Sequence, residues 1–143
     1  SSTINVPAQY FEDFLEKIFQ QVGAEAEYKV VEGFVLTRCY TNFPELFFQI
    51  SYRRPGAGSR YSSKWIQVKP EDYVYDSSPN KDGSQCTLFI SAIDEDMMVF
   101  GLPAFQQYYT VHDNQRNRLG FVPHTFSTKT ALRTESPFAK GTI

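Results

Sequence analysis

Two histidines and one run of acidic residues are the first candidates for chemistry in this sequence. His112 and His124 are too few, and too poorly matched in spacing to cysteines or carboxylates, for a zinc site with three or four protein ligands. A surface or half-buried position is the plainer interpretation for each. No glycine-rich phosphate-binding loop is present either. The sequence therefore predicts no metal site and no cofactor.

The acidic run Asp94, Glu95 and Asp96 has the charge to attract a cation. Three adjacent acids lack the alternating ligand positions of a calcium loop, so a solvated loop is the better interpretation.

Cys39 as a nucleophile would need a positioned base and a lowered pKa, and nothing in the sequence indicates one. The spacing of Cys39 and Cys86 leaves open one disulfide or two buried thiols. A disulfide would imply an oxidising, secretory environment.

The composition is that of a single globular domain of 143 residues, with 41% hydrophobic and 21% charged residues. Its 16% aromatic share favours a β-rich fold.

The net charge of −2, with no cluster of Lys and Arg, argues against nucleic acid as a partner. No apolar stretch approaches the roughly 20 residues that span a bilayer, and the first residues lack signal-peptide features, so any targeting signal lies outside them.

The elements that must position any site begin with one long helix. From 8 to 22 the apolar residues have the spacing of one buried helical face: Tyr10, Phe11, Phe14, Leu15, Ile18, Phe19 and Val22. Pro7 suits the first helical position and Gly23 suits the stop. After it the pattern becomes that of strands, which we expect at 28–36, 45–52, 61–68, 86–93 and 97–100.

Turn-rich segments connect these strands. Residues 53–60 join two strands as a β-hairpin, and 76–84 form a polar loop that leads back to the strand beginning at Cys86. A second hairpin is predicted from 108–112 and 118–122. Beyond it, 124–143 lose all periodicity, and we expect a flexible C-terminal tail.

Three parts of the sequence resemble pepsin-like aspartic peptidases. Val99-Phe100-Gly101, followed by LPAFQQYYTVHD at 102–113 and NRLGFV at 117–122, resembles the family's closing stretch. SSTINVP at 1–7, with the helix after it, resembles the segment directly after the family's second Asp-Thr/Ser-Gly triplet. Cys39, then FPELFF at 43–48 and Cys86 downstream, is similar to the disulfide of the family's C-terminal lobe. The branch most resembled is the plasmepsin-like protozoan one.

This resemblance implies a mainly β C-terminal lobe over 1–123, with one long helix and one or two short ones, from the bilobal acid protease fold. It places no catalytic residue within the chain: one aspartate is expected three residues before Ser1, and the other on an N-terminal lobe. The two carboxylates share a proton and activate water for peptide-bond hydrolysis. The implied partners are that N-terminal lobe and an extended peptide substrate or pepstatin-type inhibitor. The implied enzyme is a zymogen of the secretory pathway, extracellular or in an acidic vesicle or vacuole.

Residue by residue, Ser1 resembles the hydroxyl residue that supports the catalytic carboxylate, and Ser2 resembles one that meets the substrate backbone. Ile93 falls where the family lines the primed side of the cleft. Ordinary strand polarity and loop packing remain the alternatives for these three. Val99, Phe100 and Gly101 look like the structural segment that crosses beside the aspartate loop. Leu102 and His112 depart from the family, which commonly has Asp and Phe there.

Two other functions remain open. One is a catalytically inactive pepsin-fold binding or inhibitory protein, which a substituted aspartate in the triplet before Ser1 would indicate. The other is a free-standing β-sandwich interaction domain, which is disfavoured because it would expose the cleft face and the interlobe strands.

Overall fold

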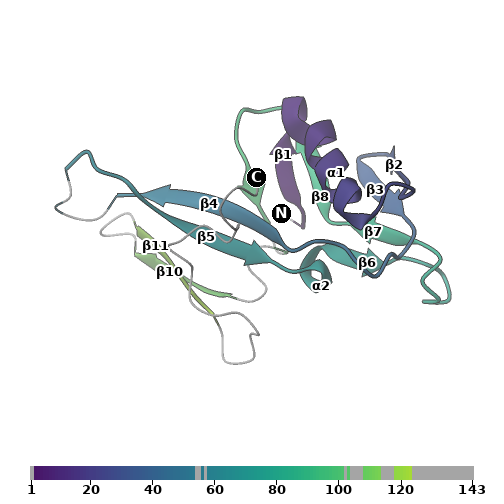
Figure 1. Cartoon of the computed structure of the whole chain (residues 1–143). Coiled ribbons are helices and arrows are strands. Elements are labelled where there is room, and N and C mark those ends of the chain that lie inside the picture. The colour runs from purple at the N-terminus through teal and green to yellow at the C-terminus, as the bar shows by residue number, and fades with distance from the viewer. Residues whose placement is uncertain are drawn as a thin grey trace. The chain divides into compact units, whose positions relative to one another are not determined.

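A computed structural model describes residues 2–53, 56, 58–101 and 103, and the backbone of 108–113 and 118–123. The chain is mainly β, as the sequence predicts (Figure 1). It divides into two compact units, of which the first contains Ser1–Glu45 and Val68–Gln106 and the second contains Leu46–Gln67 and Gln107–Ile143. Ser1, Leu102 and the expected tail at 124–143 lie outside the described residues.

The predicted helix is present as α1 (Ala8–Val22), and it begins one residue after Pro7, which ends strand β1 (Ile4–Pro7). The Gly23 N–H donates a hydrogen bond to the Phe19 carbonyl and closes the last turn. The buried face of α1 consists of Phe11, Leu15, Ile18, Phe19 and Val22. Because burying one such side chain stabilises a fold by roughly 1.5–3 kcal/mol, this face holds the helix against the strands below it.

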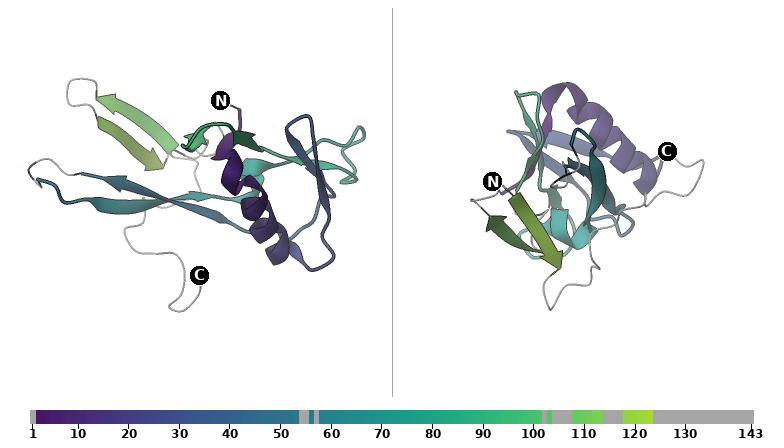
Figure 2. Two further views of the ribbon diagram at one scale, coloured as in Figure 1. Left: turned by 90° about the horizontal axis from the view of Figure 1, so that it is seen from above. Right: turned by 90° about the vertical axis from the view of Figure 1, so that its left-hand side faces the viewer.

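Strand β1 is the central strand of a three-stranded sheet in the first unit. It pairs in parallel with β8 (Ile90–Ile93) and antiparallel with β9 (Val99–Phe100), in the order β8-β1-β9. Ile4 and Val6 are buried, and α1 contacts both β1 and β8 (Figure 2). Both edges of β1 are therefore fixed by pairing, and its buried face is fixed by packing.

A four-stranded antiparallel sheet completes the first unit, in the order β2-β3-β7-β6. Its strands are β2 (Tyr28–Val31), β3 (Phe34–Thr37), β7 (Cys86–Leu88) and β6 (Val74–Asp76). The short helix α2 (Pro70–Tyr73) precedes β6, and its Tyr73 phenol is buried and donates to the Pro44 carbonyl at 2.7 Å. Burial raises the pKa of Tyr73.

The predictions of single strands at 28–36 and 86–93 are wrong. The first is a hairpin, because Glu32 and Gly33 have φ of 51° and 83° and form a two-residue turn. The second is divided at Phe89, whose N–H donates to the Tyr73 carbonyl and whose carbonyl accepts from the Ile4 N–H. Phe89 therefore connects β7 of the four-stranded sheet to β8 of the three-stranded sheet. The strand expected at 97–100 is shorter and comprises only β9.

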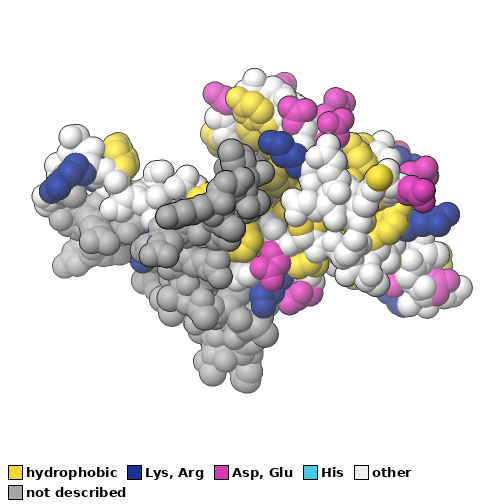
Figure 3. Space-filling model, in the orientation of Figure 1, with side chains coloured by type: hydrophobic (Ala, Val, Ile, Leu, Met, Phe, Trp, Pro, Cys, Tyr) yellow, Lys and Arg dark blue, Asp and Glu magenta, His cyan; other side chains and the backbone are white. Residues whose placement is uncertain are grey.

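Aromatic rings fill the space between α1 and the four-stranded sheet. Phe19 stacks on Tyr28 with ring centroids 4.4 Å apart, and Phe43 meets both Phe19 and Tyr73 edge to face. Glu12, Asp13 and other acidic side chains are exposed on the outer side of α1. Figure 3 shows acidic side chains on this part of the surface, with hydrophobic ones between them.

The second unit contains two strand pairs. The predicted pair around 53–60 is present as β4 (Leu46–Tyr52) and β5 (Ser62–Val68), which form a two-stranded sheet. The second predicted hairpin is present as β10 (Tyr108–Asp113) and β11 (Arg118–Pro123), which pair antiparallel; the connecting residues 114–117 are outside the described ones. Within the described part of the chain, no helix is long and apolar enough to span a membrane.

Candidate functional site

The start of β1 and residues 99–100 come together in one sheet. Ile4 pairs with Phe100 and Asn5 pairs with Val99. The buried Gly101 directly follows Phe100, the residue that pairs with Ile4. Ser2 is exposed at the entrance to β1. Ser1, the expected supporting hydroxyl, lies outside the described residues.

Ile93 lies at the other end of β1. It pairs with Pro7 in the parallel register between β1 and β8, and its side chain is half-buried. Three residue steps of extended strand separate Pro7 from Ile4, a distance of about 10 Å. Ile93 and Gly101 are therefore at opposite ends of one strand, and a ligand that contacts both would have to run along β1.

A cluster of three polar side chains, absent from the sequence-based site, lies between these ends. The hydroxyls of Thr3 and Ser91 each donate to Asn5 Oδ1 at 2.6 Å, and the two hydroxyl oxygens are 2.9 Å apart. All three residues are half-buried. Because both protons are directed at Asn5 Oδ1, that oxygen links Asn5 of β1 to Ser91 of β8 through side chains, in addition to the backbone pairing of the two strands.

Part of this cluster has a sequence signal. Thr3 and Asn5 alternate with the buried Ile4 and Val6, which is the two-residue period of a strand with one buried face. That period places Thr3 and Asn5 together on the other face. Ser91 has no such signal, because its place depends on the register between strands that are 86 residues apart in sequence.

The acidic run borders the beginning of α1. A pocket of about 220 Å³ is lined by Pro7, Ala8, Gln9, Ile93 and the three acids 94–96. The Gln9 Nε2 donates to Asp96 Oδ1 at 3.4 Å, and all three acidic side chains are exposed, as predicted for a solvated loop. The first N–H groups of a helix carry partial positive charge, so acidic residues beside the start of α1 are electrostatically favourable.

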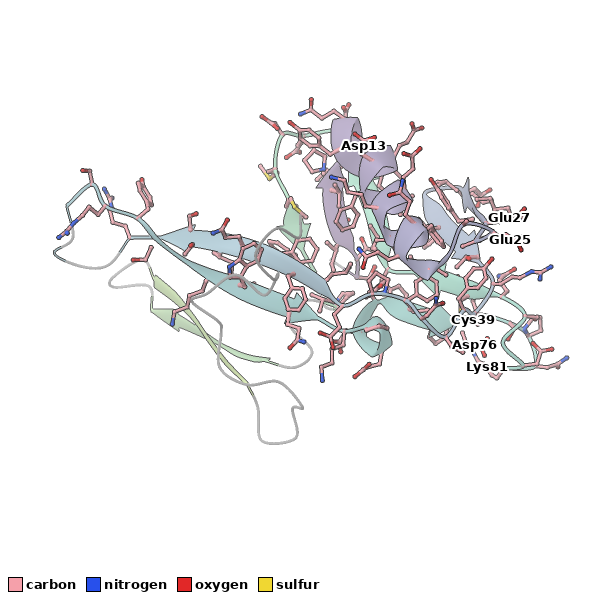
Figure 4. The ribbon with its side chains drawn as sticks, viewed as in Figure 1. Asp13, Glu25, Glu27, Cys39, Asp76 and Lys81 are labelled. Atoms are coloured by element: carbon pink, nitrogen blue, oxygen red, sulfur yellow. A yellow bond between two sulfur atoms is a disulfide. The ribbon has the colours of Figure 1, made fainter. Side chains whose placement is uncertain are left out.

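Cys39 and Cys86 are joined as a disulfide, with their Cα atoms 5.0 Å apart. A carboxylate oxygen of Asp76 lies within 4.8 Å of both sulfur atoms, and Figure 4 labels Cys39, Asp76 and Lys81 at one end of the first unit. The sulfur atoms are bonded to each other and are not available as thiolate ligands. This group is therefore structural.

Asp76 organises the loop at 76–84. It accepts hydrogen bonds from the Ser78 hydroxyl, from the Ser78 N–H at 3.0 Å and from the Gly83 N–H at 3.1 Å. These bonds, with the Ser78 hydroxyl as the largest contribution, lower the pKa of Asp76. Lys81 Nζ donates to the Asp76 carbonyl and to the Tyr75 hydroxyl, each at 2.7 Å. The loop is thus held next to the disulfide from both of its ends.

Comparison with known proteins gives one family. The family model described as eukaryotic aspartyl protease matches residues 2–124, which is most of the chain. The match is to the family as a whole and does not distinguish a plasmepsin-like branch. No curated protein matches the chain.

Proposed function

The chain belongs to the eukaryotic aspartyl protease family, and from this premise we propose that it forms the C-terminal lobe of an aspartic endopeptidase. Family membership assigns aspartic peptidase function in general terms. The more specific proposal is that residues 1–123 form this lobe, that 124–143 form a flexible tail, and that the aspartate pair is completed by residues outside these 143.

The observation that carries the proposal is the pairing of β1 with β9. This pairing places Gly101 directly after Phe100, the residue that pairs with Ile4 at the start of β1, and glycine allows close approach of another backbone. A carboxylate three residues before Ser1 would enter the fold through this crossing. Because β1 is paired on both edges and buried on one face, a loop that leads into it would have a fixed position, as a catalytic carboxylate needs.

The chemistry proposed for the site is water-mediated peptide-bond hydrolysis. Two carboxylates at close range cannot both ionise easily, so the pair holds one proton between them. The ionised carboxylate takes a proton from water, the water oxygen attacks the carbonyl carbon of the scissile peptide, and the protonated carboxyl polarises the carbonyl oxygen. The tetrahedral intermediate then collapses: the C–N bond breaks, and the leaving nitrogen takes the proton that the carboxylate had accepted from water. No covalent acyl-enzyme forms and no cofactor takes part.

Ser2 and Ile93 are the proposed substrate contacts within this chain, and Ser1 is the proposed hydroxyl partner of the carboxylate. Ser2 is exposed before the start of β1, and the half-buried Ile93 pairs with Pro7 at the other end of this strand; this placement supports an extended peptide as the ligand. The disulfide between Cys39 and Cys86 supports folding in an oxidising compartment, so we place the enzyme, made as a zymogen, in the secretory pathway, outside the cell or in an acidic vesicle or vacuole.

The test uses the intact protein that contains this chain. We expect pepstatin-sensitive cleavage of an extended peptide at acidic pH, and its loss when the aspartate three residues before Ser1 is replaced by Asn. The matched control is Asp13→Asn, an exposed acid on the outer side of α1, which leaves cleavage unchanged. Cleavage that survives the first substitution would reject the mechanism. Pepstatin-type binding without cleavage in the unaltered protein would instead support the inactive binding protein.

A further inference from the structure

Both methionines of the sequence lie in the connection between β8 and β9. Met97 is 52% exposed and Met98 is 37% exposed. Methionine side chains usually fill gaps in a hydrophobic core, and here neither does. Three acids, Asp94, Glu95 and Asp96, immediately precede them and are also exposed. The connection is therefore a surface segment with two accessible thioethers.

We propose that residues 97 and 98 are an oxidation site for peroxides. A methionine thioether reacts with hydrogen peroxide at sulfur: a sulfur–oxygen bond forms, the peroxide O–O bond breaks, and the second oxygen leaves as water. The sulfur loses two electrons and the peroxide gains them. The product is methionine sulfoxide, a polar side chain that methionine sulfoxide reductases convert back.

The two methionines differ in what oxidation does to the fold. Met97 is the more exposed and reacts first, and its new oxygen stays in solvent. Met98 directly precedes β9, where Val99 pairs with Asn5 of the central strand. A sulfoxide at Met98 puts a polar oxygen on a side chain of which only 37% is exposed, and the carboxylates that precede it are acceptors that cannot donate to this oxygen. The sulfoxide oxygen is hydrated fully only if Met98 moves outward into solvent. That movement loosens the pairing of β9 with β1.

This movement reaches the candidate site. Asn5, opposite Val99, is the acceptor of the polar cluster with Thr3 and Ser91, and Gly101 comes directly after β9. Oxidation of Met98 therefore lowers peptidase activity, and enzymatic reduction restores it. This last step rests on the proposed function, whereas the oxidation itself and the loosening of β9 do not.

The experiment exposes the intact protein to hydrogen peroxide and monitors both residues by peptide mass mapping, with the denatured protein as the reference for full exposure. We expect Met97 to react within about threefold of its denatured rate and Met98 more slowly than Met97. Faster amide exchange in the peptide containing 99–101 is expected after oxidation of Met98. Native protection of Met97 tenfold or more, or unchanged amide exchange after Met98 is oxidised, overturns the proposal.

The matched variants are Met97→Leu and Met98→Leu, which preserve volume and cannot be oxidised. After peroxide treatment, Met98→Leu is expected to keep the slow amide exchange of β9 and its peptidase activity. Met97→Leu is expected to show faster exchange in β9 and lower activity, as the wild type does. Equal loss in the two variants overturns the assignment to Met98. If the untreated protein cleaves no peptide, the proposed function fails while the mass and exchange measurements still decide this inference.

Discussion

At the scale of single residues, Asn5 holds two strands together with one oxygen. Replacing it by Leu removes the shared acceptor of the half-buried Thr3 and Ser91 hydroxyls. We expect Asn5→Leu to lower the free energy of unfolding by about 1–2 kcal/mol, because two side-chain hydrogen bonds are lost at a site partly shielded from water. Urea denaturation of the intact protein measures it.

The matched control for Asn5 is a polar residue at the entrance of the same strand. Ser2→Ala removes an exposed hydroxyl, so its effect should stay within about 0.5 kcal/mol. Equal effects of the two substitutions would mean that the cluster adds nothing to stability.

Asp76 gives a pH-dependent prediction. The Ser78 hydroxyl, the Ser78 N–H and the Gly83 N–H lower the folded pKa of Asp76, so its charged form stabilises the fold. This stability is fully present above the unfolded pKa of about 3.9 and is lost as the pH falls through the lower folded pKa. We expect wild type and Asp76→Asn to differ in melting temperature at pH 6, and the difference to shrink below about pH 4.

Asn80→Ala serves as the comparison for Asp76, because Asn80 is an exposed, non-titrating residue of the same loop. Its difference from wild type should be the same at every pH. A difference for Asp76→Asn that does not change with pH would show that its hydrogen bonds do not favour the charged form.

How far single site residues can be predicted depends on the sequence distance of their partners. The alternation of Thr3 and Asn5 with Ile4 is local and is visible in the sequence. Ser91 joins them only through the register of β1 on β8, which local patterns do not specify. The pairing of Cys39 with Cys86 is equally non-local, and only the family resemblance implies it.

At the scale of elements, the hairpin β2–β3 contains an unfavourable residue. Glu32 has φ of 51°, in the left-handed region that costs an ordinary residue roughly 1–2 kcal/mol and that Asn tolerates. Glu32 is exposed and Gly33 already suits the second turn position. We expect Glu32→Asn to raise the free energy of unfolding by about 0.5–1 kcal/mol, as measured by urea denaturation.

The comparison for this turn is Glu32→Val, a β-branched residue that is strained at positive φ and should destabilise the protein. If Asn and Val at position 32 have the same effect, then the turn does not determine the stability of the hairpin.

The same turn explains why the sequence pattern fails for one element. The apolar and β-branched run from Tyr28 to Leu36 has the composition of a continuous strand, although Glu32-Gly33 suits a two-residue turn. Helix α1 is predicted correctly because its apolar period extends over four turns and depends only on its own residues. Helix α2 and strand β6 are each too short to carry a recognisable pattern, since α2 has four residues and β6 has three.

At the scale of the whole molecule, the family can be inferred because its motifs lie in fixed order along the chain. The residues that match the closing stretch lie in Val99–Phe100, β10 and β11, and those that match the opening lie in β1 and α1. The β1–β9 pairing joins Ile4 to Phe100, 96 residues later in the sequence, which composition and periodicity alone do not predict. The order of the motifs along the chain thus provides the long-range information that composition and periodicity lack.

The disulfide gives the last prediction, because it links the segment after β3 to the first residue of β7 across a sequence separation of 47. Closing a loop of this length in the unfolded chain corresponds to roughly 4 kcal/mol of stabilisation. We expect the double variant with Cys39→Ala and Cys86→Ala to lose about 2–5 kcal/mol in urea denaturation without reductant. Wild type with excess reductant should approach the double variant, since both lack the cross-link but keep every other contact. If the reduced wild type were instead as stable as the oxidised protein, the pairing of β3 with β7 would be sufficient to hold these segments together without the covalent bond.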